Sequence, residues 1–404
     1  MKHRRFLAAL LAAAVLCPFA ALAAGEKNVD NLPIGNLEGF ESSITWFGED
    51  FAYDITDEEA CWELLQRPIT VLDVSEKEVV YPRVSPNGEK VVNEWMGGSI
   101  NGSLAAVHVL GEDEDGWTLI EGMDYYDRII RGYVKTSLLK TVTPNNKYGI
   151  IIDKLTQRLY MFIDGKLWSS CAVSTGLPNK DQPYNETAAG EYLIGSWVGG
   201  FDSEGMYCEM GIRFNGGDLL HQVPYVEFAD GTKDFSKYGS QLGRKASHGC
   251  VRVARTANDE GLCISWLWEN LKKNTKVVVW DDDGRTLPYP DDDLEVYYNP
   301  DGGTSYHATA TCRSVRDKYL PLTAFTYGEL DSGKYASLTG CTNCIPVKRH
   351  AEIDEINQER IDLGELLKNP VYTGGATTGG GAQAEGSAAS DSPEASDGVT
   401  ITIR

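Results

Sequence analysis

The sequence predicts a mostly β protein divided into several domains, and three observations support this fold class. The chain has 404 residues, enough for about two to three domains. Short runs rich in β-branched and aromatic residues alternate with turns that contain Gly, Asp, Asn and Pro. Helical spacing of apolar residues is rare and is clearest over residues 256–273 and 350–368.

The composition excludes several classes of protein. Hydrophobic residues make up 42% of the chain and charged residues 24%, as in globular proteins rather than disordered or collagen-like ones. The 37 basic and 59 acidic residues give a net charge of -22. Because phosphate binding needs clustered Lys and Arg, we expect no nucleic-acid partner. An anionic membrane surface is an equally poor partner for such an acidic chain.

Residues 1–23 predict a secretory signal peptide. Residues 2–5 are KHRR, an apolar run follows from Phe6, and Ala-Leu-Ala at 21–23 supplies small residues for cleavage. An uncleaved anchor is the alternative. No other stretch has 18 or more consecutive apolar residues, so we expect the mature chain not to span a membrane. The protein is therefore predicted to be secreted and extracytoplasmic, with an irregular segment over residues 24–60.

Residues 61–142 predict a small β domain, because they contain five short β-rich runs: 69–72, 78–81, 106–110, 117–120 and 132–134. The stretch RGYVKTSLL at 131–139, after Asp115-Gly116-Trp117, resembles a bacterial SH3-like domain. Such small barrels commonly accompany cell-wall enzymes. An unrelated small barrel is the alternative interpretation.

Residues 146–282 form the longest β-rich block. Residues 149–152 and 158–162 predict a hairpin, and Asp164-Gly165 predicts the turn to the next strand. The helical pattern of residues 256–273 lies inside this block, and a strand is predicted to end it at 275–280. We therefore expect one mostly β domain with a single helix.

The heptapeptide SHGCVRV at 247–253 places a thiol beside groups that can activate it. A thiol is nucleophilic only as the thiolate, so it needs a nearby base or a positive field. His221 and His248 are the two histidines of this block, and Arg252 follows Cys250 by two positions. Gly249 lets the backbone approach a ligand, and neighbouring N–H groups can bind an oxyanion. This pattern predicts acyl transfer through a thioester.

The heptapeptide, together with LHQVPY at 220–225, resembles the catalytic core of the L,D-transpeptidases, cysteine enzymes of peptidoglycan cross-linking. The resemblance spans residues 148–282, about a third of the chain. Supporting segments are QRLY at 157–160, DGK at 164–166, VSTG at 173–176 and TAAGEY at 187–192. The resemblance implies a β-sandwich with one helix.

The resemblance also implies a role for each residue of the site. Cys250 matches the nucleophile, and its own N–H matches an oxyanion donor. His221 matches the base, oriented by the carbonyl of Gln222. The remaining positions match the pocket and the oxyanion site: Ser247, His248, Gly249 and Arg252. No cofactor is expected for catalysis.

Two features depart from the family pattern. Ser247 lies 26 positions after His221, farther than the family usually shows, so we expect an inserted loop near the site. A lid and a substrate-selecting loop are the two interpretations of it. The usual Thr-Pro before a glycine is Thr187-Ala188 here, which predicts a looser turn without an effect on the chemistry.

Residues 296–349 predict a small module that contains Cys and His. The spacing His307-x4-Cys312-x28-Cys341-x2-Cys344 fits one structural zinc site with three thiolates and one imidazole. A disulfide between two of the three cysteines, and unrelated thiols, are the alternatives. Four protein ligands leave no open position, so we expect no catalysis there. A short helix and a flexible low-complexity tail are predicted over 350–404.

The sequence as a whole predicts a secreted peptidoglycan L,D-transpeptidase that acts on tetrapeptide stems. Attack by Cys250 would release the terminal D-Ala, and an amine of another stem or of a protein would resolve the acyl-enzyme. If water resolves it, the protein is an L,D-carboxypeptidase. Another wall-peptide cysteine hydrolase is a further alternative, although papain-like ones place Cys before His in the chain. The last alternative is a non-catalytic protein that binds the cell wall.

Overall fold

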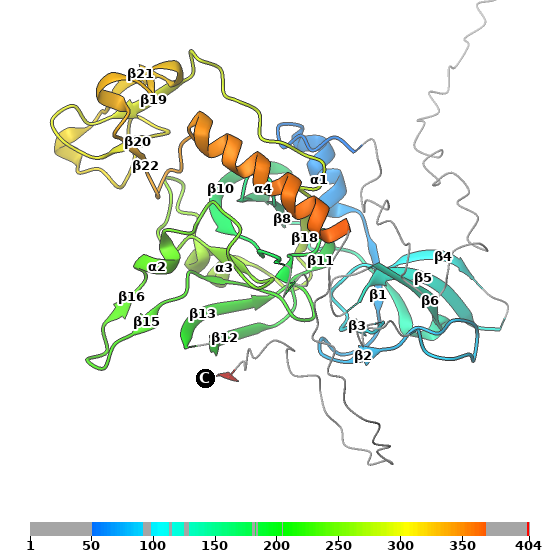
Figure 1. Cartoon of the computed structure of the whole chain (residues 1–404). Helices are drawn as coiled ribbons and strands as arrows, with labels where there is room; N and C mark the ends of the chain where they lie inside the picture. Colours follow the sequence, from blue (N-terminus) through cyan, green and yellow to red (C-terminus); the bar gives the residue numbers. More distant parts are fainter. Residues whose placement is uncertain are drawn as a thin grey trace, which may run out of the picture.

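The computed structural model describes residues 51–91, 98–112, 115–124, 129–179, 182, 185–203, 205–368 and 402–403. Along the chain these residues form a small β unit, a large sheet with its helices, and a C-terminal module followed by a long helix (Figure 1). The predicted signal peptide lies outside the described residues, as does most of the predicted tail. In the described part, none of the helices has the length and hydropathy needed to cross a membrane.

The small β unit occupies residues 69–142. Its strands are β1 (Ile69–Leu72), β2 (Val79–Val80), β3 (Ile100–Asn101), β4 (His108–Glu112), β5 (Trp117–Met123), β6 (Ile129–Lys135) and β7 (Leu139–Val142). Strands β4, β5 and β6 form an antiparallel sheet, while β1 pairs with β7 and β2 with β3. All five predicted runs overlap these strands. Assignment of the unit to the SH3-like family stays a prediction.

Helix α1 (Glu58–Gln66) precedes this unit but packs on the large sheet. The Asp57 side chain caps it by accepting a hydrogen bond from the Ala60 N–H at 3.0 Å. The helix buries Cys61, Leu64 and Leu65 against residues of the sheet that include Ile151, Phe162, Val278 and Trp280. Residues 58–66 thus fold with the large sheet, whereas the sequence placed the start of the small β domain at residue 61.

Two residues of the large sheet fit this helix closely. Gly149 gives it room, because a Cβ there would lie 2.7 Å from the Leu65 Cδ1 atom. The ammonium of the fully buried Lys276 donates to the carbonyls of Leu64 at 2.7 Å and Arg67 at 2.9 Å. These bonds satisfy the carbonyls at the C-terminal end of α1, which a helix leaves unpaired.

The large sheet has ten strands among the described residues. Their order is β11 (Gly190–Leu193), β18 (Lys276–Trp280), β8 (Tyr148–Asp153), β9 (Arg158–Ile163), β10 (Lys166–Ser174), β17 (Val251–Val253), β14 (Leu219–Gln222), β13 (Met206–Arg213), β12 (Trp197–Ser203) and β23 (Thr402–Ile403). The β18–β8 and β14–β17 pairs are parallel. Strand β23 belongs to the predicted flexible tail, yet it pairs with β12 at the edge of the sheet.

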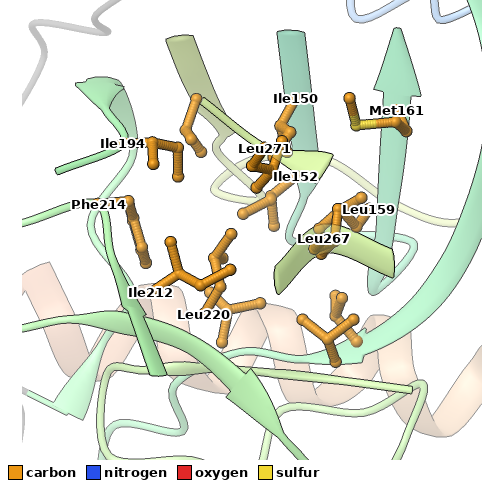
Figure 2. Close-up of a cluster of buried hydrophobic side chains, with 14 of the residues drawn as sticks. Ile150, Ile152, Leu159, Met161, Ile194, Ile212, Phe214, Leu220, Leu267 and Leu271 are labelled. Carbon is orange, nitrogen blue, oxygen red and sulfur yellow. The ribbon is translucent and has the colours of Figure 1, made fainter. Parts of the chain in front are cut away.

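The sheet curls around β10, whose first part pairs with β9 and whose end pairs with β17. Side chains from both halves therefore meet in one core, as Figure 2 shows for Ile152 and Leu159 on one side and Ile212 and Leu220 on the other. Leu267 of helix α3 (Ile264–Asn270) completes this core. The predicted sandwich is thus one continuous curled sheet.

Helix α3 is shorter than the predicted helix of residues 256–273, because Asn258 folds the preceding segment into a turn. Its side-chain oxygen accepts from the Leu262 N–H at 2.8 Å, and its amide donates to the Ser170 carbonyl at 2.9 Å. Gly261, inside this turn, has a φ of 98°, which helical residues do not adopt.

The C-terminal module has a four-stranded sheet in the order β21 (Thr323–Thr326), β19 (Glu295–Tyr298), β20 (Ser305–His307) and β22 (Thr339–Gly340). Helix α4 (His350–Lys368) follows it and runs back toward the large sheet (Figure 1). Arg360 of this helix lies 2.8 Å from an Asp282 carboxylate oxygen, just after β18. The predicted helix of residues 350–368 is therefore part of the packed structure.

The packing of α1 predicts the effect of Leu65→Ala. Leu65 is 0% exposed, so truncation should lower the free energy of unfolding by about 2–5 kcal/mol, measured by denaturant titration. Ile361→Ala, on the exposed side of α4, is the control and should change it by less than about 0.5 kcal/mol. Equal, small effects of both variants would contradict the placement of α1 on the sheet.

Candidate active site

Two parallel strands bring the predicted nucleophile and base to one face of the sheet. Strands β14 and β17 pair with His221 in register with Arg252, and Cys250 immediately precedes β17. Successive side chains of a strand point to opposite faces. Val251 and Leu220 enter the main core, so Cys250, Arg252 and His221 lie together on the other face.

The neighbouring strands β12 and β13 supply an apolar wall on that face. Phe201 and Cys208 are directly opposite each other in register, and both pack with Leu219 and the partly buried Cys250. The Phe201 ring meets the His221 ring edge to face, with 5.3 Å between the centroids. The imidazole is therefore held against an aromatic ring and is only 3% exposed.

The hydrogen bond of His221 determines which ring nitrogen is free to act. Its Nδ1 atom lies 2.7 Å from the carbonyl oxygen of Gln222, which can only accept, so Nδ1 carries the proton. Burial, and secondly the charge of Arg252, lower the pKa of His221 to about 3. The imidazole is therefore neutral at pH 7, with the lone pair of Nε2 available to take a proton.

Cys250 is also neutral at rest. Burial, and secondly the Asp218 carboxylate, raise the pKa of its thiol to about 12, against smaller opposing effects of the Leu219 backbone, Arg213 and Arg252. Both pKa shifts therefore disfavour a resting thiolate–imidazolium pair. Activation of this thiol requires a base that takes its proton as the new bond forms.

Arg252 is positioned by the loop between His221 and Ser247, the predicted inserted loop. The loop contains β15 (Val226–Glu227), β16 (Lys233–Asp234) and the short helix α2 (Ser236–Gly239). The Arg252 guanidinium donates to the Gln241 side chain at 2.7 Å and lies 5.4 Å from the centre of the Tyr238 ring. A long connection between β14 and β17 is unavoidable, because parallel strands require a crossover. These contacts give the loop a positioning function beside the site.

The backbone of the heptapeptide is held by two hydroxyl groups. The Ser247 hydroxyl bonds to the Cys250 carbonyl and accepts from the Gly249 N–H at 3.3 Å. The Thr187 hydroxyl donates to the Gly249 carbonyl at 2.6 Å and accepts from the Gly176 N–H at 2.8 Å. The Thr187-Ala188 departure from the family pattern therefore keeps the hydroxyl that contacts the heptapeptide.

The structure also gives the surroundings of two further predicted site residues, Gly249 and His248. The Gly249 N–H, predicted to bind an oxyanion, is already bonded to Ser247, so Cys250 supplies the remaining predicted N–H. The His248 side chain is exposed to solvent, and its predicted place in the pocket stays a prediction. Gly249 itself cannot be replaced without strain, because its φ is 118° and a Cβ would lie 2.7 Å from an Asp218 carboxylate oxygen.

A buried network of charges supports the heptapeptide from its N-terminal side. The Lys245 ammonium lies 2.9 Å from Glu186 and 2.9 Å from Asp282. Lys154 also contacts Glu186, at 2.8 Å, and Arg360 of α4 contacts Asp282. Removal of one member would leave its partners charged in a buried place, which is strongly unfavourable. The network thus connects α4 to the residues beside Thr187 and Ser247.

Asp218 and Arg213 belong to the site, although sequence reasoning did not identify them. Burial raises the pKa of Asp218 to about 7, while Asn215 and Arg213 oppose this. The Asn215 amide donates to the Asp218 carboxylate at 3.3 Å, and Arg213 donates to the Gly216 carbonyl at 2.6 Å. In the sequence, NGGD at 215–218 is typical of a turn, and only strand pairing shows its closeness to Cys250.

The predicted metal ligands come together outside the large sheet. One ligand atom each of His307, Cys312, Cys341 and Cys344 lies within 4.8 Å of the others in the C-terminal module. None of these residues takes part in the contacts of Cys250 and His221 described above.

Residues 147–279 match the family model of the YkuD L,D-transpeptidase catalytic domain. The match covers about a third of the chain and includes all residues from Thr187 to Arg252 described above. The mostly β fold of this YkuD-type domain agrees with the fold class predicted from the sequence. No curated protein matches the chain.

Several solved structures are similar to the YkuD-type domain. An L,D-transpeptidase from Stackebrandtia nassauensis is 21% identical over 33% of this chain and 56% of its own, with a TM-score of 0.22. An L,D-transpeptidase from Xylanimonas cellulosilytica is 20% identical over 34% of this chain and 61% of its own, with a TM-score of 0.25. A protein from Clostridium acetobutylicum, described as a fused Zn-dependent amidase/peptidase/peptidoglycan-binding domain-containing protein, is also similar. It is 19% identical over 34% of this chain and 55% of its own, with a TM-score of 0.25. This chain thus spans little more than half the length of these proteins.

The charge interaction between Asp218 and the Cys250 thiol predicts a pH-dependent reactivity. Asp218 becomes charged as the pH rises through about 7, and its charge raises the pKa of Cys250. Asp218→Asn should therefore lower the pKa of the thiol and speed alkylation of Cys250 by iodoacetamide above pH 7. One pKa unit changes the thiolate fraction about tenfold. Below pH 6, where Asp218 is protonated, the variant should match the wild type.

The rate is measured by mass spectrometry of the peptide that contains Cys250, over pH 5–10. Asp230→Asn, in the exposed turn of the inserted loop, is the control and should leave the profile unchanged. Identical profiles of Asp218→Asn and wild type would show that Asp218 does not act on the thiol.

Proposed function

We propose that the protein is a secreted peptidoglycan L,D-transpeptidase with Cys250 as its nucleophile. The observation that carries this proposal is the placement of Cys250 and a neutral, oriented His221 on one face of a YkuD-type domain. The basic start and apolar run of residues 1–23 support export. The substrate is a tetrapeptide stem of the cell wall, as the family of the domain suggests.

In the first half-reaction, the Cys250 sulfur attacks the carbonyl that joins the third-position diamino acid to the terminal D-Ala. Nε2 of His221 takes the thiol proton as the C–S bond forms. The resulting tetrahedral oxyanion accepts a hydrogen bond from the Cys250 N–H. His221 then gives the proton to the amine of D-Ala, the C–N bond breaks, and a thioester remains on Cys250.

In the second half-reaction, a neutral amine attacks the thioester carbonyl, and His221 takes its proton. The C–S bond breaks and the sulfur regains the proton from His221, so atoms and charge balance. The amine belongs to a neighbouring stem or to a protein. With water as the acceptor, the same steps give an L,D-carboxypeptidase.

The surroundings of the site favour a concerted proton transfer. A thiolate formed in advance would be unfavourable, because burial and Asp218 raise the pKa of Cys250. The charges of Arg252 and Arg213 act in the opposite direction and stabilise negative charge as it develops on the sulfur. Because the inserted loop positions Arg252, we propose that this loop contributes to the rate.

The mechanism predicts covalent capture of a carbapenem. The β-lactam carbonyl should acylate Cys250, which raises the intact mass of the protein by the mass of the whole drug. Cys250→Ala should form no adduct, since the proposed nucleophile is removed. His221→Gln should react about 100-fold or more slowly, because general-base catalysis is lost. Both are measured by intact-mass spectrometry over time.

Matched controls separate these effects from damage to the fold. Cys61→Ala removes a buried thiol on α1, and His108→Gln changes a histidine of the small β unit; both should keep the wild-type rate. An adduct on Cys250→Ala, or none on folded wild-type protein, would be incompatible with the proposed mechanism.

A further inference from the structure

We propose that the C-terminal module binds one Zn²⁺ ion through His307, Cys312, Cys341 and Cys344. His307 is the last residue of β20, and Cys312 follows in the next loop. Cys341 follows β22, and Cys344 completes the C-x2-C pair. Three separate segments of the chain therefore contribute ligands to one place. This inference does not depend on the proposed function.

The distances between the ligand atoms fit a tetrahedral zinc site. The Cys312 and Cys341 sulfurs are 3.9 Å apart, and the Cys344 sulfur is 3.7 Å from Nδ1 of His307. With a zinc–sulfur distance of about 2.3 Å, the edge of a regular tetrahedron is about 3.8 Å. The four ligand atoms all lie within 4.8 Å of one another, so one ion can contact all of them.

A disulfide explains the same residues less well. The bond requires sulfurs about 2.05 Å apart, whereas those of Cys312 and Cys341 are 3.9 Å apart. A disulfide would also use only two of the three cysteines, and it would not explain why the His307 ring lies beside them. Three thiolates and one imidazole are a set that favours zinc over Mg²⁺ or Ca²⁺, which prefer oxygen ligands.

Hydrogen-bond donors surround the sulfurs, as is typical of metal-bound thiolates. The Ala308 N–H donates to the Cys344 sulfur at 3.2 Å, and the Asn343 N–H donates to the Cys341 sulfur at 3.4 Å. The Ser314 hydroxyl lies 3.1 Å from the sulfur of Cys312. Three thiolates and one Zn²⁺ carry a net charge of −1, so these donors stabilise the occupied site.

The role of this ion is structural. Four protein ligands leave no position for substrate or water. The core of the module consists of six buried side chains and three partly buried ones, and small units of this size usually need a metal or disulfides to fold. The ion would join the β20 hairpin to the loop that leads into α4.

The module also touches the YkuD-type domain. Arg313, next to Cys312, donates to the Asn258 carbonyl at 3.2 Å. The Lys348 ammonium lies 3.6 Å from the place that a Cβ on Gly243 would occupy, and Gly243 follows the residues that position Arg252. The module therefore lies against the YkuD-type domain at the turn that Asn258 forms.

Metal content of the full-length protein tests the inference. The wild type, purified without chelators and analysed by inductively coupled plasma mass spectrometry, should contain one zinc per chain. Cys344→Ser should hold less than about one tenth of this, while Cys61→Ala, which removes a buried thiol elsewhere, should keep it. Protein produced with cobalt should show thiolate-to-cobalt charge-transfer absorption in the near ultraviolet, and Cys344→Ser should not.

A second measurement on the wild type covers the case in which Cys344→Ser does not fold. Peptide mapping without reduction should find all three module cysteines free once the metal is chelated. Wild-type protein without metal, but with a disulfide between two of these cysteines, would overturn the inference. Full zinc content in Cys344→Ser would overturn it as well. Neither measurement uses substrate, so each outcome is independent of the transpeptidase proposal.

Discussion

The parallel pairing of β14 with β17 is the constraint on which the rest of the site depends. It sets His221 beside the residues that follow Cys250 and leaves Leu220 and Val251 to the core on the opposite face. A shift of the strand register by one residue would turn each side chain to the opposite face and bury the reactive groups in the core. A parallel pair also requires a long crossover, and this chain uses that crossover to hold Arg252 in place.

Burial then decides how the proposed nucleophile and base work. The neutral form of each is favoured, because burial disfavours the charged form more strongly than the neighbouring groups stabilise it. The charged groups nearby are divided by function: Arg252 and Arg213 favour negative charge on the sulfur, and Asp218 opposes it. Behind the heptapeptide, ion pairs of Asp282 with Lys245 and with Arg360 connect the heptapeptide's N-terminal side to α4.

Part of this arrangement could be predicted from the sequence, because local patterns encode it. β-rich runs and turn residues predicted four of the ten strands described in the large sheet, namely β8, β9, β10 and β18, and the spacing of His307, Cys312, Cys341 and Cys344 predicted that they would meet. Helix α1 was not predicted, because a helix of nine residues shows only a weak periodic pattern of apolar residues. Asp218 and Phe201 were missed for a different reason: they reach Cys250 and His221 through pairing between strands, which local patterns do not encode. The bond from the Gly249 N–H to Ser247 depends on backbone geometry that only the structure gives.

The most direct test of the account is the reaction itself. Mature protein is incubated with purified disaccharide-tetrapeptide beside a Cys250→Ala control, and the products are identified by mass spectrometry. The proposed mechanism predicts dimers that lack one D-Ala, formed by the wild type and absent from the control. Tripeptide without dimers would identify water as the acceptor and the protein as an L,D-carboxypeptidase. Unchanged substrate with the folded wild type, or equal turnover by Cys250→Ala, would contradict the central role given to this thiol.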